Sequence, residues 1–380
     1  MKVLILTVSM GQGHNVTAQA IAGRLEERGA FCRIVDIMEY SNPHLTKAIT
    51  RSYLWTARKL PVMYRTAYNI AEKEHYLPVE PLSVIMEHVY LTELAACIAD
   101  FEPDCVFSTH VFAALAASKL KKRPCSDVPF FGLVTDYCIH PYWSQARLDY
   151  LITASPFQNR EALRKGIPRG KILPLGIPLR PQFYHSVPKE EARRTLGLHP
   201  GKATVMLAGG GLGYGRLDRI LAELDHLPED FQVISICGGN SELKETIDAR
   251  HWQKEIHNYG YVDNIHLMMD AADFLVSKPG GITVTESIAK RLPLIMLKPI
   301  PGQEERNAEF LLTHKGGLLA ASQKKPADLT QVLLNKPRLR KKLQRNIARL
   351  SRGNSNETIC NFILDGRGGR TTKAGRASFG

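Results

Sequence analysis

The sequence has no long apolar run and no pairing pattern among its cysteines. No segment of the 380 residues approaches the roughly 18 to 20 apolar positions that a membrane-spanning helix needs. The apolar stretch at residues 3–8 is too short for a signal peptide and leads into a glycine loop. The 7 cysteines form neither a Cys-x-x-Cys pair nor an even disulfide framework, so we expect most of them to be small buried residues. These absences predict a cytoplasmic protein.

Metal-binding patterns are absent as well. No Asp-x-Asp triplet occurs, and no group of His or Cys residues has the spacing of metal ligands. We therefore expect no bound metal and no other cofactor.

Acidic residues are fewer than basic ones, 37 against 50, which gives a net charge of +13 and a pI near 9.4. Such a balance favours an anionic partner: nucleic acid, an anionic membrane surface or a substrate that carries phosphate. A solvated basic face without a specific partner is the alternative. The 44% hydrophobic content is typical of a globular α/β protein, and the length suffices for two domains.

One stretch in the second half of the chain combines a predicted strand, a glycine pair and a predicted helix. Residues 272–277 are apolar, as in a buried parallel strand, and residues 283–290 follow as a helix. Between them, Gly280 and Gly281 leave backbone N–H groups bare at a helix N-terminus, which suits a diphosphate. Glu286, in the first turn or so, can accept hydrogen bonds from a ribose diol. The alternative is an ordinary turn with a Glu that interacts with the helix dipole.

A polar segment follows the next predicted strand, residues 292–297. Its side chains Gln303, Glu304 and Asn307 can all bond sugar hydroxyls. Because open α/β sheets bind ligands beyond the carboxyl ends of their strands, two neighbouring strand ends should converge on one crevice. The combination indicates a nucleotide ligand.

The chain begins with a similar unit: a strand at residues 2–8, a glycine loop and a helix at residues 16–28. Gly11 and Gly13 are not followed by a third glycine at the dinucleotide spacing, so we reject NAD. His14 lies where the loop enters the helix. Its imidazole either faces a crevice as a general base or packs locally.

A second glycine loop opens the C-terminal half. A predicted strand, residues 203–208, leads into residues 209–215, 5 of which are glycine, and a helix follows. A phosphate cradle fits this order better than a flexible hairpin tip. Its candidate glycines are Gly210, Gly211 and Gly213.

Polar residues also follow the strand predicted at residues 129–136. Asp136, His140 and Trp143 lie at its carboxyl end, where acceptor recognition can occur. The other predicted strands are residues 103–110, 150–154, 172–175, 232–239 and 257–262.

Two segments are strongly basic. Residues 45–90 interleave basic and aromatic residues, a pattern that fits either a membrane-surface patch or a core-facing helix. Residues 336–352 form a basic helical stretch. Beyond residue 365 the chain has no acidic residue, so we expect a disordered tail that touches anionic lipid.

Five motifs, in this order, resemble monogalactosyldiacylglycerol synthases and bacterial processive diacylglycerol glucosyltransferases. Relatives of that family include the N-acetylglucosaminyltransferase that makes the peptidoglycan lipid intermediate. The resemblance covers about residues 1 to 355. The motifs are Gly11-Gln-Gly-His14, Val134-Thr-Asp136 with His140 and Trp143, Gly209 to Gly215, Ser277 to Gly281 with Thr283 and Glu286, and Pro301 to Glu304 with Asn307.

The resemblance implies a GT-B fold, in which two Rossmann-like domains face each other across a cleft. It implies an N-terminal acceptor and membrane domain, residues 1–178, a C-terminal UDP-sugar domain, residues 179–355, and a basic tail, residues 356–380. The implied activity is inverting, metal-independent transfer of a hexose from a UDP-sugar to diacylglycerol, peripherally at the inner face of the cell membrane. The rivals are an isoprenoid-linked or soluble acceptor, and a non-catalytic sugar-nucleotide or nucleic-acid binder. Because no nucleic-acid fold signature occurs, we expect no nucleic-acid partner.

The resemblance also assigns roles to residues. His14 becomes the base that takes the proton of the acceptor hydroxyl, and Glu286 holds the ribose. The implied acceptor side comprises Gly11, Gly13, Asp136 and His140. The implied donor side comprises Gly210, Gly211, Gly213, Lys278, Gly280, Gly281, Thr283, Glu286, Gln303, Glu304 and Asn307.

Overall fold

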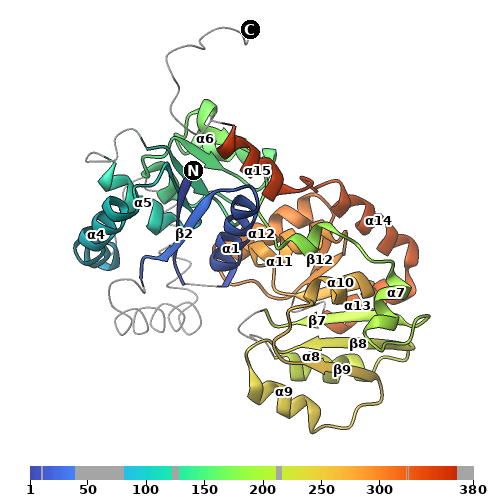
Figure 1. Ribbon diagram of the computed structural model, residues 1–380. Helices are drawn as coiled ribbons and strands as arrows, with labels where there is room; N and C mark the ends of the chain where they lie inside the picture. Colours follow the sequence, from blue (N-terminus) through green and yellow to red (C-terminus); the bar gives the residue numbers. More distant parts are fainter. Residues whose placement is uncertain are drawn as a thin grey trace. The chain divides into compact units, whose positions relative to one another are not determined.

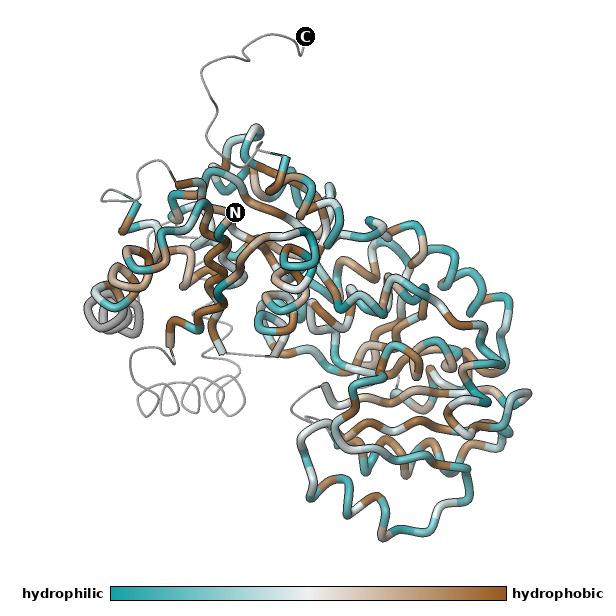
Figure 2. The backbone as a smooth tube through the Cα atoms, in the orientation of Figure 1, coloured by the Kyte–Doolittle hydropathy of each residue, from teal (hydrophilic) through white to brown (hydrophobic). Residues whose placement is uncertain are grey.

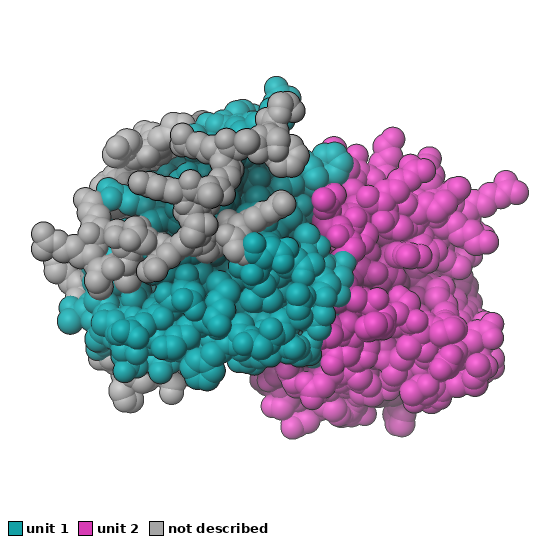
Figure 3. All heavy atoms as spheres, turned by 45° about the horizontal axis from the view of Figure 1, so that its top comes forward, with its two compact units in different colours: residues 1–180, 354–380 teal, residues 181–353 magenta. Residues whose placement is uncertain are grey.

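The computed structural model describes residues 1–9, 12–38, 81–121, 128–210, 216–321, 323 and 325–365. The chain divides into two compact units (Figure 3). Unit 1 comprises residues 1–180 and 354–380, and unit 2 comprises residues 181–353. Among the described residues, no helix combines the length and apolarity that crossing a bilayer requires.

Unit 1 is built on a parallel sheet with the strand order β2-β1-β3-β4-β5-β6 (Figure 1). The apolar runs that predict β1, β3 and β4 are buried almost throughout, because helices cover both faces of the sheet. Figure 2 shows apolar residues concentrated along such strands. The strands are β1 (Lys2–Thr7), β2 (Phe31–Asp36), β3 (Cys105–Ser108), β4 (Phe130–Leu133), β5 (Tyr150–Ile152) and β6 (Ile172–Leu173).

The helices of unit 1 form a layer on each face of its sheet. One core joins α1 and α15 to the sheet through residues such as Ile21 and Ile359, and the other joins α4 and α5 through Ile98 and Ala113. The helices are α1 (Gln12–Glu27), α4 (Pro81–Phe101), α5 (Val111–Leu120), α6 (Asn159–Arg164) and α15 (Ser355–Leu364), with short 3-10 turns η1 (Pro141–Ser144), η2 (Pro156–Gln158) and η3 (Arg169–Lys171).

Helix α15 corrects the predicted tail, which was expected to begin at residue 356. The guanidinium of Arg24 on α1 donates to the carboxylate of Glu357, with an Nε to Oε2 distance of 2.6 Å. The amide of buried Asn356 bonds both backbone groups of Leu179, at 2.8 and 3.1 Å. Apolar and polar contacts together hold residues 355–364 on unit 1. This stretch is helical because its composition, unlike that of a disordered segment, includes apolar residues that pack into the core.

Unit 2 repeats the architecture, with the strand order β12-β11-β10-β7-β8-β9 in a parallel sheet. The strands are β7 (Ala203–Ala208), β8 (Phe231–Ile236), β9 (Glu255–Tyr259), β10 (Phe274–Ser277), β11 (Leu294–Met296) and β12 (Gly317–Leu319). The helical elements are η4 (Pro181–Tyr184), α7 (Lys189–Thr195), α8 (Leu217–Asp225), α9 (Ser241–Asp248), α10 (Ile265–Ala271), α11 (Gly281–Ala289), α12 (Gln303–Thr313), α13 (Pro326–Asn335) and α14 (Pro337–Ala348).

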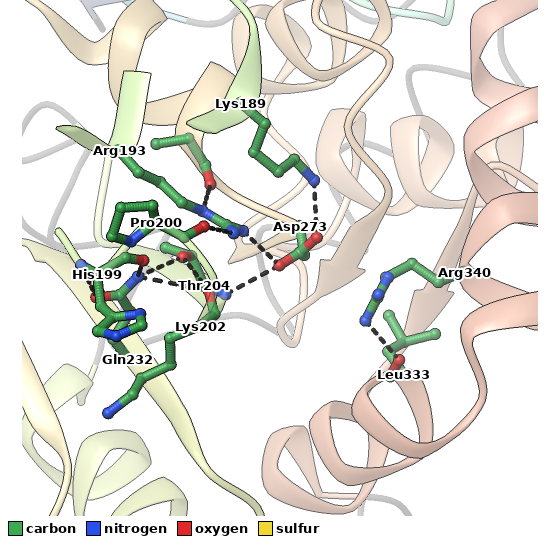
Figure 4. A network of polar contacts seen from close by, with 11 residues as sticks. Lys189, Arg193, His199, Pro200, Lys202, Thr204, Gln232, Asp273, Leu333 and Arg340 are labelled. Atoms are coloured by element: carbon green, nitrogen blue, oxygen red, sulfur yellow. Dashed lines mark hydrogen bonds and ion pairs between the residues drawn. The ribbon is translucent and has the colours of Figure 1, made fainter. Parts of the chain in front are cut away.

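A largely buried carboxylate, Asp273, anchors the amino end of the central strand β10 (Figure 4). Asp273 accepts hydrogen bonds from Arg193 at 2.8 Å, from Lys189 at 2.7 Å and from the N–H of Thr204 at 2.9 Å. Burial alone would raise the pKa of Asp273, but Lys189 and the Thr204 N–H outweigh it and hold this pKa below its ordinary value. The cluster ties α7, β7 and β10 together.

A second buried ion pair fixes the far end of helix α11. Lys290 follows the helix and bonds Asp270 at 2.7 Å, with side chains only 0% and 4% exposed. Its ammonium group also donates to the carbonyl oxygen of His185. Helix α11 is therefore held at its carboxyl end by protein contacts, which leaves its amino end to be shaped by the glycine turn.

Candidate active site

The candidate base lies at the carboxyl edge of the unit 1 sheet. His14 is in the first turn of α1, the helix that follows β1 in the chain. Its Nδ1 atom lies 2.8 Å from the carbonyl oxygen of Thr109 and 3.2 Å from the hydroxyl oxygen of Thr135. Thr109 follows β3 and Thr135 follows β4, so three neighbouring strands deliver these groups to one place.

The Thr109 carbonyl decides which nitrogen of His14 carries the proton. A carbonyl oxygen only accepts hydrogen bonds, so Nδ1 must be the protonated nitrogen of the neutral ring. Nε2 then keeps its lone pair. A neutral imidazole in this tautomer can accept a proton at Nε2.

The pKa of His14 is lowered. Desolvation lowers it most, while the negative charge of Asp136 and the hydrogen bond to Thr109 raise it in part. The ring is therefore neutral at physiological pH, which is the state that a general base needs. Asp136, predicted as an acceptor residue at the end of β4, thus also acts electrostatically on His14, which the sequence did not predict.

The loop after β4 is held in shape by side chains that cap its turns. Buried Gln158 donates from Nε2 to the carbonyl oxygen of Asp136 at 2.9 Å. The Nδ1 atom of His140 accepts the N–H of Tyr142 at 3.3 Å, at the start of η1. Burial, with a contribution from Lys165, lowers the pKa of His140 to about 4.

His110 is a residue of this cluster that sequence reasoning missed. Its ring packs edge-on against that of His14, with the ring centroids 4.5 Å apart. It lies two residues after the end of β3, as Asp136 comes soon after β4, so the signal in the sequence was a polar residue at a strand end. That signal alone does not separate it from an ordinary helix cap.

The candidate donor site lies at the carboxyl edge of the unit 2 sheet. Strands β7, β10 and β11 are neighbours, and the predicted loops follow each of them. The hydroxyl of Ser277 donates to the carbonyl oxygen of Ala208 at 2.9 Å, which joins the ends of β10 and β7. Gly210 has φ +70 and Gly302, the cap of α12, has φ +95, values that favour glycine at both turns.

Nothing in the described part of the chain requires glycine at position 280. Gly280 caps α11 with φ −65 and ψ 149, which any residue adopts, and among the described residues an added Cβ would meet Thr283 Oγ1 alone, at 3.9 Å. The absent side chain instead leaves the backbone N–H groups of the first turn of α11 open to a ligand.

Other predicted donor residues lie around this turn. Lys278, Thr283 and Glu286 are half-buried, and Gly281 begins α11. The helix begins two residues earlier than predicted because the glycine pair is itself part of its first turn. Glu286 therefore lies in the second turn.

The segment before α12 is shaped by its own carboxylates. Glu304 accepts the N–H of Ile300 at 2.7 Å, and Glu305 accepts the N–H of Gly302 at 3.2 Å. Gln303 is half-buried. Asn307 is 0% exposed, so in this structure its amide has no surface to offer a sugar, and we leave it out of the proposed contacts.

Three predicted site residues, Gly11, Gly211 and Gly213, lie outside the described residues. Gly13 lies in the first turn of α1, beside His14.

Both units match known glycosyltransferase families. Residues 14–179 match the family model of monogalactosyldiacylglycerol (MGDG) synthase, and residues 204–358 match that of the glycosyltransferase family 28 C-terminal domain. The processive diacylglycerol beta-glucosyltransferase of Bacillus subtilis is 27% identical over 366 residues, which cover 96% of this chain and 94% of that protein. The enzyme of the same name from Staphylococcus epidermidis is 26% identical over 96% of this chain and 92% of its own length.

The chain is a glycosyltransferase whose N-terminal half resembles MGDG synthases.

Solved structures agree on the fold of this glycosyltransferase. MurG of Acinetobacter baumannii has a TM-score of 0.65 at 12% identity, with 96% of this chain and 99% of that chain covered. Anabaena Alr3699/HepE in complex with UDP and glucose has a TM-score of 0.58 at 13% identity, with 96% and 98% covered. The fold is therefore GT-B, with two Rossmann-like domains, as the resemblance implied.

Proposed function

We propose that this glycosyltransferase moves a glucosyl group from UDP-glucose to the hydroxyl of diacylglycerol, with inversion at the anomeric carbon. The choice of hexose and acceptor is supported by the relatives, whose names specify diacylglycerol and a beta-glucosyl product. The observation that carries the proposal is the state of His14. Its Nδ1–H is engaged by Thr109 at 2.8 Å, which leaves Nε2 as a neutral base.

In the proposed reaction, the acceptor hydroxyl gives its proton to Nε2 of His14. The hydroxyl oxygen forms a bond to the anomeric carbon, while the bond from that carbon to the diphosphate oxygen breaks. The electron pair of the broken bond leaves with UDP. Gly13, Asp136 and His140 surround the acceptor in this proposal, and the charge of Asp136 stabilises His14 once it is protonated.

The donor is bound by unit 2 in this proposal. Gly210 and the turn at Gly280 and Gly281 present backbone N–H groups to the diphosphate, with Lys278 and Thr283 beside them. The carboxylate of Glu286 accepts from the ribose. Gln303 and Glu304 bond the hexose.

The departing UDP carries roughly two to three negative charges, which the protein must stabilise. We propose that helix α11, whose N-terminus carries a partial positive charge, and Lys278 supply this stabilisation without a metal ion. No other cofactor takes part, and UDP-glucose serves as co-substrate.

We also propose peripheral attachment to the anionic inner face of the cell membrane, with no nucleic-acid partner. Helix α14 and its flanks present a row of exposed cations with no acidic residue between positions 336 and 352. Such a face attracts anionic lipid headgroups. Of the two segments predicted to contact the membrane, residues 45–90 lie almost wholly outside the described residues, and the tail beyond residue 365 lies outside them entirely. The exposed cations are Lys336, Arg338, Lys341, Lys342, Arg345, Arg349 and Arg352.

The deciding experiment incubates the purified chain with diacylglycerol vesicles and, in separate reactions, UDP-glucose, UDP-galactose or UDP-N-acetylglucosamine. Mass spectrometry of the lipids should detect glucosyl-diacylglycerol with UDP-glucose. Product with UDP-galactose alone would contradict the hexose. Binding of UDP without any modified lipid would contradict the acceptor and favour an isoprenoid-linked or soluble one.

A further inference from the structure

His110 is not among the residues that the family resemblance assigned, yet it contacts the proposed base directly. Its ring lies edge-on to the His14 ring, with 4.5 Å between centroids and an interplanar angle of 75°. The preceding residue, Thr109, supplies the carbonyl that binds His14. The short segment between β3 and α5 therefore makes two contacts with His14, one from the Thr109 carbonyl and one from the His110 ring.

The backbone fixes the tautomer of His110, and it is opposite to that of His14. The Nδ1 atom of His110 accepts the N–H of Phe112 at 3.2 Å, as the cap of α5. An accepting nitrogen carries a lone pair, so the proton of the neutral ring is on Nε2. His14 carries its proton on Nδ1.

The segment between β3 and α5 has little freedom. The N–H of Thr109 bonds the carbonyl oxygen of Leu6 in β1 at 2.9 Å, and Ser108 donates its hydroxyl to the His110 carbonyl oxygen at 2.9 Å. His110 is only 9% exposed. The His110 ring is thus held against the His14 ring and cannot rotate away from it without loss of the helix cap.

The charges around these rings keep His110 neutral. Burial lowers the pKa of His110 well below its ordinary value, and His14 and His140 lower it further. Among the described residues, the negative charge of Asp136 raises the pKa of His14, and the positive charge of Lys165 lowers the pKa of His140. A single negative group thus faces several imidazoles, so a proton taken up by the cluster goes to His14, the ring that Asp136 stabilises.

We propose that His110 is a positioning residue for the base: locked in the Nε2–H tautomer by the α5 cap, it fixes the orientation of the His14 ring and shields it from water. This inference rests on the proposed role of His14. It adds a residue that acts through the base and need not touch the substrate.

Two substitutions separate the helix cap made by Nδ1 of His110 from the packing of the His110 ring against His14. In His110→Asn, the side-chain oxygen takes the place of Nδ1 and keeps the cap, while the rest of the ring is lost. In His110→Gln, the amide reaches the place of Nε2 and the cap is lost. Full-length proteins would be compared by melting temperature, by the pH dependence of kcat, and by NMR of the histidine nitrogens.

The wild-type protein should show Nδ1–H at His14 and Nε2–H at His110. His110→Asn should melt as the wild type does, lower kcat about 10- to 100-fold with an unchanged KM for UDP-glucose, and move the His14 titration to higher pH. His110→Gln should melt at a lower temperature and keep more of kcat than the Asn variant.

A wild-type kcat and an unmoved His14 titration in His110→Asn would overturn the inference, as would an Nδ1–H tautomer at His110. Equal losses of kcat and melting temperature in both variants would also overturn it, because they indicate a purely structural role. If no variant glycosylates diacylglycerol, the wild type included, the acceptor proposal fails. The His14 titration then still decides the role of His110.

Discussion

The reactivity of His14 is set by one backbone carbonyl oxygen. Because Thr109 follows a strand directly beside β1, its carbonyl meets Nδ1 at 2.8 Å and leaves the lone pair on Nε2. An isolated histidine would share its proton between both nitrogens and titrate near pH 6.5. Here desolvation lowers the pKa of the ring, so it remains an available base in slightly acidic solution.

Replacement of His14 by alanine should lower kcat about 10²- to 10⁴-fold, the usual contribution of a general base. UDP affinity should stay unchanged, because the proposed nucleotide contacts all belong to unit 2. Steady-state kinetics and UDP titration calorimetry measure the two quantities. In the wild type, the acidic limb of kcat should fall below pH 6.5, since the pKa of His14 is lowered. Near-normal turnover of the alanine variant would remove His14 from the mechanism.

Candidate residues could be proposed from the sequence only where the local pattern carried the chemistry. His14 and the glycine pair at Gly280 stand out because strand, loop and helix signals surround them. His110 does not stand out. Its proposed role depends on which of its ring nitrogens accepts the Phe112 N–H, and on the contact of its segment with His14, about 95 residues away in the chain. The burial of Asn307 was not predictable for the same reason: its amide chemistry fits a sugar, but tertiary packing determines that the side chain is buried.

At the scale of elements, the carboxyl ends of parallel strands gather both candidate sites. Three adjacent strands meet at each site, β1, β3 and β4 in unit 1 and β7, β10 and β11 in unit 2. The buried central strands were predicted well because their apolar runs are continuous. Strands β2 and β12 were missed. The first is a partly exposed edge strand with a mixed pattern, and the second has 3 residues, too few to show a period.

The turn before α11 gives an element-scale prediction. Gly280→Ala should fold with an unchanged melting temperature, because the backbone conformation suits alanine and the nearest neighbour of the new Cβ is 3.9 Å away. It should weaken UDP binding about 10-fold, because the methyl group obstructs a diphosphate that approaches the backbone. Gly201→Ala, where the added Cβ meets His199 at 3.7 Å, is the matched control in the same unit and should bind UDP normally. Wild-type UDP affinity in Gly280→Ala would contradict the phosphate site.

The anchor of β10 gives a prediction about stability and pH. Asp273→Asn should destabilise unit 2 by about 3 kcal/mol, because buried Arg193 loses its anionic partner. The pKa of Asp273 is depressed in the folded state, so its contribution is present above the unfolded pKa and is lost as pH falls through the folded pKa. The stability difference between wild type and variant should therefore shrink below about pH 4. Urea unfolding at several pH values measures it, and a difference independent of pH would contradict the role of the charge.

At the scale of the whole molecule, the positive charge is spread unevenly, and helix α14 with its flanks carries a large share of the exposed cations. Figure 2 shows this helix as largely hydrophilic. Composition gave the net charge of +13 but could not say which surface carries it. In the structure, buried Leu343 and Ile347 define the inner face of α14, and the helical period then places the basic residues on its outer face.

Reversal of three α14 charges, Lys341→Glu, Lys342→Glu and Arg345→Glu, should release the protein from vesicles that contain anionic lipid. The loss should be largest at low salt, because the attraction is screened by ions. A control with equal net charge reverses three exposed arginines of unit 1, Arg160, Arg164 and Arg169, to Glu. Vesicle flotation compares the two. If both triple variants bind alike, the net charge of the protein matters and the face of α14 does not.

Unit 1 is completed by helix α15, which follows all of unit 2 in the chain, and this sets the order in which the two units can be completed during translation. Unit 2 is one continuous segment, residues 181–353, and all of it emerges before α15. The GT-B half with the nucleotide loops can therefore finish folding during translation. Unit 1 cannot, because Arg24 and Leu179 receive their partners Glu357 and Asn356 only after all of unit 2 has been synthesised. A message interrupted between residues 353 and 355 would thus yield a fragment with a complete unit 2 and an incomplete unit 1.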